Sequence, residues 1–368
     1  MKLLNFLFLL AFLTSCNGQN TLTTTKTSAT QLGDTVTGMS KDCWIVFQAT
    51  NGDYWFGSNT DGAYKFDGKV LVQFSEKDGL SNNSVRDIQE DKNGNIYFST
   101  IGGISKFDGE TFTTLTTIKS NGPNENWKLQ PDDVWFNTLG KDGENGPLRY
   151  DGKHLYQLEF PKHYLADDYY KQFPNKSWSP YDVYYSYKDS KGTMWFGTSN
   201  LGVCRYDGKS ISWLYEDHLT NTPAGGSFGI RSILEDREGK FWFCNTNYRY
   251  NIDSQTSIED GKSLITYTKE KGIDSIKTAD GSSNIYYMSV VEDSNGDLWM
   301  ATYSQGVWKY DGKNVTHYPV KDGAKDATVF SIYKDRKGGL WLGTHEAGLY
   351  KFDGNEFEKF ELSAEETN

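Results

Sequence analysis

The sequence predicts an all-β protein made of repeated four-stranded antiparallel sheets, because strand-like runs and tight turns alternate and recur. The unit is clearest in residues 329–360, where four short apolar or aromatic runs are separated by turn residues. Residues 335–338 (Asp-Arg-Lys-Gly) and the pair Asp353-Gly354 mark two of these turns. Short runs with period-2 alternation, bounded by Gly and Asp, are typical of antiparallel strands joined by hairpins.

The same unit recurs along the chain and can be aligned on two positions. One is the aromatic residue that opens the second strand, at Trp55, Tyr97, Trp135, Trp195, Trp242, Trp299 and Trp341. The other is the Asp of an Asp-Gly turn before the fourth strand, at Asp67, Asp108, Asp151, Asp207, Asp260, Asp311 and Asp353. Neighbouring turns are between 41 residues (Asp67 to Asp108) and 56 residues (Asp151 to Asp207) apart, so the unit carries insertions.

A repeat of about 40–45 residues with four strands per copy is typical of a propeller blade. The seven copies predict a seven-bladed β-propeller, with four antiparallel strands per blade, over residues 41–361. One such sheet cannot bury both of its faces, so each blade must stack on its neighbours around a central channel. The aromatic residue that opens the second strand is therefore expected to pack between blades, and residues 362–368 are expected to form a C-terminal tail.

The N-terminus predicts export. Lys2 precedes an apolar run at residues 3–13, which is too short to span a membrane and indicates a signal peptide at residues 1–15. The run ends in Leu13-Thr14-Ser15-Cys16, which resembles a bacterial lipobox and would make Cys16 the lipidated first residue of the mature protein. The alternative is an ordinary signal peptide in which Cys16 has no such role.

Residues 16–40 are rich in Thr, Ser and Gly and are expected to form a flexible tether. In the alternative, part of this stretch adds a strand to the last blade and latches the ring. The first and last copies each hold four strand-like runs of their own, which favours closure without strand exchange.

Composition narrows the function classes. The net charge of −11 argues against binding to nucleic acid and to anionic membrane surfaces, which leaves membrane contact only through the lipid anchor. Besides Cys16 there are three cysteines, Cys43, Cys204 and Cys244, scattered over three copies of the repeat. They are expected to be small buried hydrophobic residues, with a Cys204–Cys244 disulfide as the alternative.

Three segments carry a more specific pattern: KDSKGTMWFGT at residues 188–198, EDSNGDLWM at 292–300 and KDRKGGLWLGT at 334–344. This pattern resembles the two-component regulator propeller repeat, and the resemblance extends over most of residues 41–360. In that family such propellers commonly form the periplasmic sensor part of hybrid histidine kinases, often carbohydrate-sensing. The resemblance implies a sensor-like protein of the bacterial cell envelope. The tyrosine-rich, kinase and DNA-binding regions of the family are not found in this sequence, so we expect that it does not transmit a signal by itself. After Cys16, the residues Asn17-Gly18-Gln19 lack the acidic cluster that some lipoprotein families use for surface export, which favours a lipid-anchored form on the periplasm-facing outer membrane.

The positions of the insertions in the repeat predict which face of the propeller binds a ligand. Loops between second and third strands, and links between blades, share one face of a propeller, and all the long insertions are of these two kinds. The insertions fall at residues 118–133, 139–147, 161–182, 216–229, 246–257 and 269–285. Several long side chains in or beside them are candidate ligand contacts, namely Trp127, Tyr169, Tyr170, Trp178, Tyr181, Arg249 and Tyr303. Their rings suit a glycan, a peptide or a partner protein, and the alternative is packing within the loops. Of these, Trp178 is expected to be exposed.

The first strands predict a second set of contacts. The hairpin between the first and second strands of a copy opens with Asp91, Asp189, Asp236, Asp293 or Asp335, and Ala49 takes this place in the first copy. Five residues before these positions lie Trp44, Arg86, Tyr184, Arg231, Met288 and Phe330, which should surround the mouth of the channel on the loop-bearing face. Arg86 and Arg231 are the candidate contacts here, because paired guanidinium groups can hold a carboxylate or an acidic sugar. The alternative is internal pairing with Asp87 or Glu235.

Catalysis has weaker support. The five histidines show no metal-ligand spacing, and the stretch at residues 293–297 is expected to be a turn rather than a calcium loop. His345-Glu346 is a pair of neighbouring His and carboxylate residues in a loop of this face, and His345 is a further candidate contact. Some seven-bladed rings are lyases that open cyclic antibiotics with a His and a divalent metal. The sequence thus predicts a non-catalytic binding protein without cofactor or metal, with a metal-dependent lyase-like enzyme as the alternative.

Overall fold

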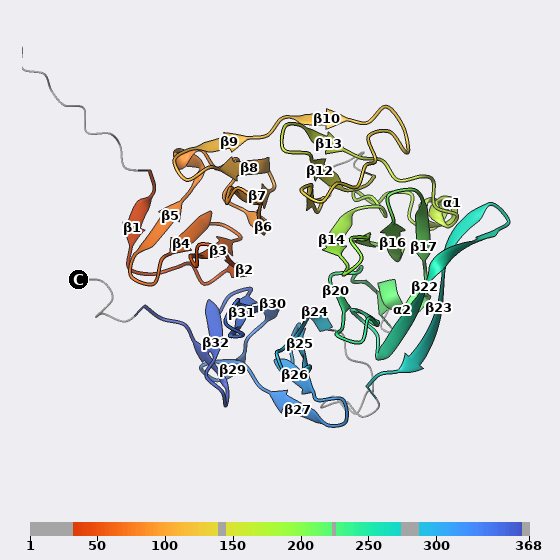
Figure 1. Cartoon of the computed structure of the whole chain (residues 1–368). Coiled ribbons are helices and arrows are strands. Elements are labelled where there is room, and N and C mark those ends of the chain that lie inside the picture. The colour runs from red at the N-terminus through yellow and green to blue at the C-terminus, as the bar shows by residue number, and fades with distance from the viewer. Residues whose placement is uncertain (1–31, 139–144, 223–225, 274–286, 363–368) are drawn as a thin grey trace, which may run out of the picture. The chain divides into compact units, whose positions relative to one another are not determined.

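The computed structural model describes residues 32–138, 145–222, 226–273 and 287–362. The chain divides into two units, residues 1–31 and 32–368, and only the second contains described residues. The signal peptide, Cys16 and most of the predicted tether therefore lie outside the described residues. Within the second unit the sheets follow one another around a centre (Figure 1). No helix among the residues described is both long and apolar enough to cross a membrane.

Four of the sheets are antiparallel and follow the chain in simple order. The first has the order β1-β5-β4-β3-β2, and the others run β6 to β9, β24 to β27 and β30 to β33. Their strands are β1 (Asp34–Val36), β2 (Cys43–Gln48), β3 (Tyr54–Ser58), β4 (Ala63–Phe66), β5 (Leu71–Phe74), β6 (Val85–Glu90), β7 (Ile96–Thr100), β8 (Gly103–Phe107), β9 (Phe112–Thr114), β24 (Tyr287–Glu292), β25 (Leu298–Thr302), β26 (Val307–Tyr310), β27 (Val315–Tyr318), β30 (Val329–Lys334), β31 (Leu340–Thr344), β32 (Leu349–Phe352) and β33 (Phe357–Lys359).

The middle of the chain departs from this plan. One sheet has the order β10-β13-β12-β11, and an eight-stranded sheet has the order β14-β15-β16-β17-β23-β22-β21-β20. Their strands are β10 (Thr117–Lys119), β11 (Val134–Phe136), β12 (Leu148–Tyr150), β13 (Leu155–Gln157), β14 (Val183–Lys188), β15 (Met194–Thr198), β16 (Val203–Tyr206), β17 (Ile211–Leu214), β20 (Ile233–Glu235), β21 (Phe241–Phe243), β22 (Tyr248–Glu259) and β23 (Lys262–Lys271).

Short elements lie in the connections between these sheets. Two hairpins and three helical segments are present, namely β18 (Asn221–Thr222) with β19 (Gly226–Ser227), β28 (Lys321–Asp322) with β29 (Lys325–Asp326), the 3₁₀ turn η1 (Glu76–Asp78), α1 (Ala166–Gln172) and α2 (Asp217–Thr220).

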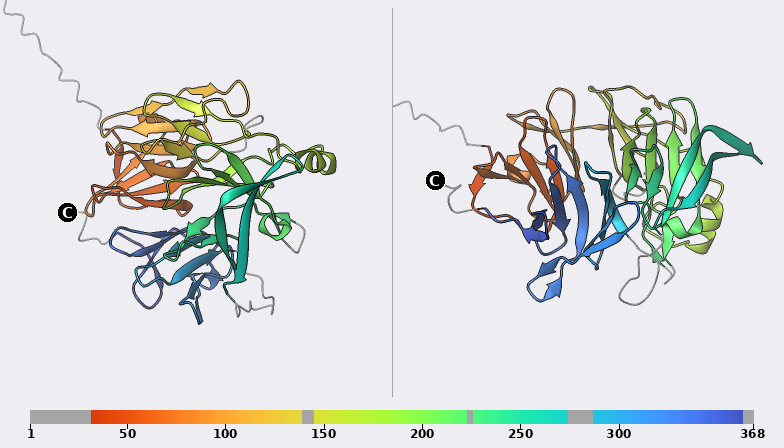
Figure 2. Two further views of the ribbon diagram at one scale, coloured as in Figure 1. Left: turned by 45° about the vertical axis from the view of Figure 1, so that its right-hand side comes forward. Right: turned by 60° about the horizontal axis from the view of Figure 1, so that its bottom comes forward.

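The all-β prediction is confirmed, but four antiparallel strands in every blade is not what the sheets show. β10 pairs with β13 in parallel, and β17 pairs with β23 in parallel through the single register pair Trp213 and Leu264. The latter contact joins two four-stranded halves into one sheet. It arises because β22 and β23 are unusually long and form a hairpin that projects from the other strands (Figure 2).

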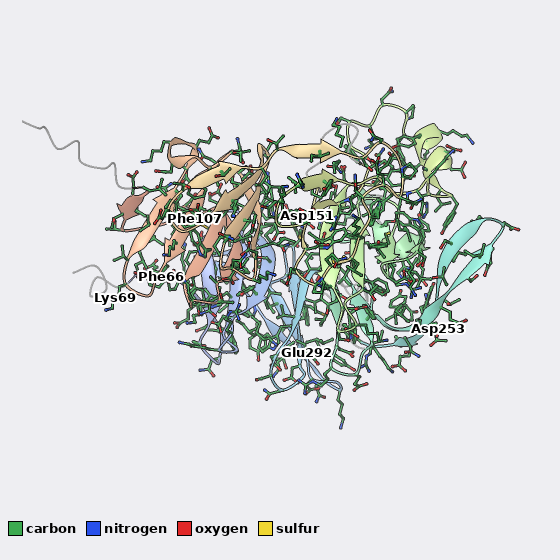
Figure 3. All side chains as sticks on the ribbon, turned by 45° about the horizontal axis from the view of Figure 1, so that its top comes forward. Phe66, Lys69, Phe107, Asp151, Asp253 and Glu292 are labelled. Atoms are coloured by element: carbon green, nitrogen blue, oxygen red, sulfur yellow. The ribbon has the colours of Figure 1, made fainter. Side chains whose placement is uncertain are left out.

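One predicted insertion is therefore mostly a strand rather than a free loop, and another begins in a strand. Residues 118–133 begin inside β10, which supplies the outer edge of its sheet. Residues 246–257 lie mostly in β22, whose backbone also contacts the neighbouring β16. There the Arg205 guanidinium donates from Nη1 to the carbonyl of Asp253, at 2.7 Å, and Asp253 lies on the projecting hairpin (Figure 3). Most of residues 139–147 and 269–285 lie outside the described residues.

The ring closes where the first described sheet meets the last. Ser331 Oγ donates to the Trp44 carbonyl at 2.5 Å, and Tyr54 Oη donates to Asp335 at 2.8 Å. A Cβ on Gly343 would lie 2.1 Å from the Trp44 carbonyl oxygen, so the contact requires glycine there. The last sheet is complete with its own four strands, in agreement with closure without exchange. The end of the expected tether nevertheless forms β1, which pairs with β5 of the first sheet.

One polar contact recurs in the core. In four places the tryptophan near the start of the second strand donates from its indole Nε1 to the Asp of the hairpin between the first and second strands. The distances are 2.8 Å for Trp195 and Asp189, 2.9 Å for Trp242 and Asp236, 2.9 Å for Trp299 and Asp293, and 3.0 Å for Trp341 and Asp335. The carboxylate of Asp335 also accepts from the backbone N–H groups of Lys337 and Gly339. Residues 293–297 make the same turn, as expected.

These tryptophans pack on the next sheet, which confirms their predicted position between blades. The Trp341 ring lies 5.0 Å from that of Tyr54, and the Trp195 ring lies 4.5 Å from that of Phe241. Cys43, Cys204 and Cys244 are buried free thiols, so the prediction of small buried residues is confirmed and the alternative Cys204–Cys244 disulfide is wrong.

We expect Asp335→Ala to lower the free energy of unfolding by roughly 1–3 kcal/mol, because the buried Trp341 N–H and the Tyr54 hydroxyl lose their acceptor. Burial raises the pKa of Asp335, but hydrogen bonds from Trp341, Tyr54 and the backbone outweigh it and leave the pKa below its usual value. The stabilisation is thus present above the usual pKa and is lost as pH falls through the lowered one. Urea unfolding at pH 7 and pH 3 measures both effects.

The matched control is Asp353→Ala, in the exposed Asp-Gly turn of the same sheet, where only backbone N–H groups lose an acceptor. Equal losses for Asp335→Ala and Asp353→Ala at pH 7 would contradict a special role of the buried contact.

Candidate functional site

A β-bulge near the start of the innermost strands builds the site. In five of these strands the register with the next strand shifts across one residue, which has no cross-strand partner. A bulge leaves the extra residue unpaired and can redirect its side chain. The five residues are Trp44, Arg86, Tyr184, Met288 and Phe330, and all of them line one cavity.

Arg231 takes the corresponding place just ahead of β20, two residues before this inner strand begins, and it lines the same cavity. Its backbone N–H donates to Cys244 Sγ at 3.1 Å. The structure thus brings together all six residues that the repeat alignment assigned to the channel mouth.

The cavity has a volume of about 560 Å³, within the usual range for small-molecule sites. Apart from Val183, which is the first residue of β14, its remaining wall comes from second-to-third turns and from links between sheets, as expected for this face. These residues are Ile101, Asn137, Thr138, Trp178, Asp182, Val183, Phe228, Tyr303 and His345.

Both arginines lie against aromatic faces. The guanidinium carbon of Arg86 lies 4.3 Å from the centre of the Trp44 ring, and that of Arg231 lies 4.4 Å from the Tyr184 ring. Burial lowers the pKa of Arg86, and the positive charge of Arg231 lowers it further, so the two cations act on each other. Cation–π contacts of this kind partly offset the loss of water around a guanidinium group.

The alternative of internal ion pairs for these arginines is wrong for the described residues. Arg231 Nε donates to the carbonyl of Phe228 at 2.9 Å, and neither guanidinium is bonded to a carboxylate there. Asp87 accepts hydrogen bonds from Ile88 and Gln89. Glu235 accepts from the backbone and hydroxyl of Ser190.

His345 lies among aromatic rings of the cavity. Its ring centre is 4.7 Å from that of Trp44, 5.2 Å from that of Phe330 and 5.5 Å from that of Tyr303. Burial lowers the pKa of His345, Glu346 raises it, and Arg231 and Arg86 lower it again, with a net decrease. The imidazole is therefore neutral at pH 7, and its Nε2 has no hydrogen-bond partner among the described residues.

Two further buried polar atoms of the wall lack a partner in the part of the chain that the structure describes. They are Trp44 Nε1, which is a donor, and Asn137 Oδ1, which is an acceptor. Together with the arginines they give the cavity hydrogen-bonding groups that a ligand can satisfy.

Five of the ten candidate contacts line the cavity, namely Arg86, Trp178, Arg231, Tyr303 and His345. Trp178 is 38% exposed and Tyr303 is 44% exposed, which confirms the expectation for Trp178. The Lys176 ammonium lies 4.0 Å from the centre of the Trp178 ring.

The other five candidates lie outside the wall of the cavity. Trp127 donates to the carbonyl of Glu159 at 3.0 Å and packs in the core, and the buried Tyr181 accepts a hydrogen bond from the backbone of His163. These two are packing residues, in line with the alternative stated for the insertions. Tyr169 and Tyr170 lie on α1, where their rings contact each other.

Arg249 belongs to a different site, and its prediction as part of the same binding face is wrong. Its guanidinium lies 2.7 Å from Asp236 and 2.9 Å from Glu238, next to a hairpin turn. The reason is that β22 begins at Tyr248 and pairs through Tyr250 with Phe241 of β21, which puts Arg249 on a strand beside that turn instead of in a loop.

Sequence reasoning missed several residues of the wall. Asn137 and Thr138 follow β11, which is the innermost strand of its sheet because no separate first strand precedes it. Without that strand, residues after the second one reach the cavity. The alignment of first strands gave only six residues for seven copies of the repeat, and this gap was the signal that could have pointed to Asn137 and Thr138.

Side chains that could ligate a metal ion are not clustered in the described ranges. No group of three or more His, Cys, Asp and Glu residues suited to a metal occurs there. His345 and Glu346 thus have no third residue of this kind in a suitable position within those ranges.

Comparison with known proteins identifies the repeat. The family model described as "Two component regulator propeller" matches residues 79–102, 177–200, 280–304 and 323–346. The chain thus contains two component regulator propeller repeats in four places. A search of curated proteins found no sequence match.

Solved structures show the same fold at low identity. The extracellular domain of BT4673 from B. thetaiotaomicron, described as a one component or hybrid two component system, has a TM-score of 0.55 at 22% identity, covering 89% of this chain and 41% of that chain. Virginiamycin B lyase from Staphylococcus aureus has a TM-score of 0.59 at 16% identity, covering 86% and 97%.

PorZ, a surface component of the type-IX secretion system of Porphyromonas gingivalis, has a TM-score of 0.55 at 16% identity, covering 85% of this chain and 46% of that chain. The chain thus spans less than half of the BT4673 domain and of PorZ. At these identities the likeness shows the propeller fold alone.

We expect Arg249→Ala to leave ligand binding in the cavity unchanged and to lower the free energy of unfolding by roughly 1–3 kcal/mol, because the buried Asp236 loses a charged partner. Urea unfolding measures the loss. Lys92→Ala is the control, because its ion pair with Asp132 is exposed at both side chains and contributes little. A loss of binding by Arg249→Ala would contradict the position assigned to it.

Asp87, next to Arg86, gives a prediction on pH. Burial raises its pKa to about 6, although hydrogen bonds from Gln89 and Ile88 act against the shift. Because the folded state favours the protonated carboxyl, stability falls as pH rises from the usual pKa through 6.

We therefore expect Asp87→Asn to be more stable than the wild type at pH 8, by roughly 1–3 kcal/mol, and equally stable near pH 3.5. Urea unfolding of both proteins across this range measures the difference. A difference that does not change with pH would show that Asp87 has an ordinary pKa.

Proposed function

We propose that this protein is a non-catalytic, sensor-like propeller that binds a ligand in the cavity at the channel mouth. The ligand is a carboxylate-bearing glycan or peptide, or an acidic segment of another envelope protein. The observation that carries the proposal is the pair Arg86 and Arg231, which line one cavity without a carboxylate on either guanidinium in the described part of the chain.

Two cations that act on each other in a partly buried site are destabilising until an anion neutralises them. A carboxylate can accept two parallel hydrogen bonds from one guanidinium, so it provides both charge and geometry. The net charge of −11 makes this positive site distinct from the rest of the protein. A bound anion is thus stabilised by its contacts with the two guanidinium groups, because water alone replaces these contacts poorly.

The aromatic residues supply flat surfaces beside the charges. Trp178 and Tyr303 remain partly exposed, and Trp44, Phe330 and His345 form a cluster. Such rings suit the face of a sugar or of an apolar side chain. This arrangement supports recognition rather than a bare ion site.

We also propose that the ring has seven blades. The eight-stranded sheet would count as two blades, β14–β17 and β20–β23, joined at their outer edges by β17 and β23. The contacts between innermost strands support this count, because they lead around the ring from β2 through β6, β11, β14, β20, β24 and β30.

The placement in the cell is a further part of the proposal. We propose a protein anchored by a lipid on Cys16, with residues 16–31 as a spacer, on the periplasm-facing outer membrane. The signal-like N-terminus and the fold shared with an extracellular sensor domain support an envelope location.

The alternative function is a metal-dependent lyase-like enzyme. It is favoured by the likeness to virginiamycin B lyase, most of whose chain is covered, and by the position of His345 in the cavity beside Glu346. A lyase would form a product in the presence of a divalent metal and would lose turnover in His345→Ala. A binding protein would show saturable affinity and no product.

We expect Arg86→Ala and Arg231→Ala each to weaken binding of an anionic ligand at least ~10-fold, and the double variant to abolish it, because each loses a charge-assisted hydrogen bond. A thermal-shift screen of acidic oligosaccharides and peptides selects the ligand, and calorimetry then gives the affinities.

Arg237→Ala is the control for a general loss of positive charge, since its exposed ion pair with Glu292 lies outside the cavity. Unchanged affinity in the double arginine variant, with an intact thermal transition, would refute the proposed site.

A further inference from the structure

We propose that the deep part of the cavity binds the C-terminal residue of a peptide whose last side chain is aromatic or apolar. This inference rests on the proposed function and specifies its ligand. The carboxylate would lie between Arg86 and Arg231, and the side chain would contact the apolar wall.

The wall distinguishes a peptide from a sugar. Five of its fifteen lining residues, Ile101, Val183, Phe228, Met288 and Phe330, offer no side-chain hydrogen bonds. A sugar ring carries several hydroxyl groups, and burying any of them without a hydrogen-bond partner is unfavourable. An aromatic or apolar side chain instead gains free energy from the area it removes from water.

The polar atoms of the wall match a peptide bond. Asn137 Oδ1 is an acceptor and Trp44 Nε1 is a donor, and both lack a partner in the described residues. A peptide unit has one N–H and one C=O, so it offers a partner of each kind. His345 Nε2 can add a hydrogen bond to the carboxylate, because the imidazole lies in the same aromatic cluster as Trp44.

The size of the cavity agrees with this occupant. About 560 Å³ is enough for a ligand of two or three residues. Upstream residues of the peptide would then leave past Trp178 and Tyr303, whose rings are exposed at the edge of the cavity.

The test compares matched ligands on the full chain by calorimetry. The probes are acetyl-Ala-Ala-Phe with a free carboxylate, the same peptide as its C-terminal amide, and digalacturonic acid. We expect the free acid to bind, the amide to bind at least ~10-fold more weakly, and digalacturonic acid to bind more weakly than the free acid.

Variants connect the result to the named residues. We expect Arg86→Gln with Arg231→Gln to abolish binding of the free acid, and Asn137→Leu to weaken it several-fold with little change in the preference for the acid over the amide. Arg237→Ala is the control, and the thermal transition of each variant verifies folding.

Three outcomes overturn the inference, and they can be told apart. If digalacturonic acid binds in an arginine-dependent way and the peptides do not, the peptide assignment fails and the proposed binding function stands. If neither class binds and the wider acidic panel also fails, the proposed function fails with it. Equal binding of acid and amide would likewise refute a C-terminal carboxylate.

Discussion

The hydrogen bond from a buried indole to a turn carboxylate is the constraint on which the rest of this propeller depends. In the last sheet, Asp335 accepts from Trp341 and from the backbone of its own turn, so one side chain fixes both the hairpin and the aromatic ring. That ring then packs on the first sheet, where Tyr54 donates to the same carboxylate. Because the carboxylate is buried, its hydrogen bonds are strong and costly to remove. Local turn geometry and packing between sheets are therefore coupled.

Because the turns and the packing between sheets are fixed in this way, the bulged residue of each inner strand can vary in sequence. The bulged residue of each inner strand has no cross-strand partner, so its side chain is not constrained by the ladder. The chain places Trp44, Arg86, Tyr184, Met288 and Phe330 there, and the bulge presents all of them to one cavity. The structural residues of the repeat and the residues of the cavity wall are thus separate positions of the same strand. This separation is what makes the cavity a candidate site.

Charge gives the cavity its chemical character. Burying two guanidinium groups near each other is unfavourable, and the faces of Trp44 and Tyr184 offset only part of that cost. Neutral His345 adds no charge but offers a polar nitrogen within the aromatic cluster. An anion with an apolar or aromatic body complements both features. The proposed sensor-like function follows from this combination, while the repeat family by itself indicates only the fold and its common use in sensors.

The sequence by itself determined the repeat, the strand runs and the inner-strand position that faces the channel, because these depend on local periodicity and short turns. It therefore located Arg86 and Arg231 correctly, and Trp178 as an exposed ring. Only the tertiary structure decided which aromatic residues are packing, since Trp127 and a ligand contact look alike in sequence. It also decided that residues 248–259 extend as a strand, which carries Arg249 to Asp236, and that Asn137 reaches the cavity. These outcomes depend on long-range pairing and on a missing inner strand, which local patterns do not encode.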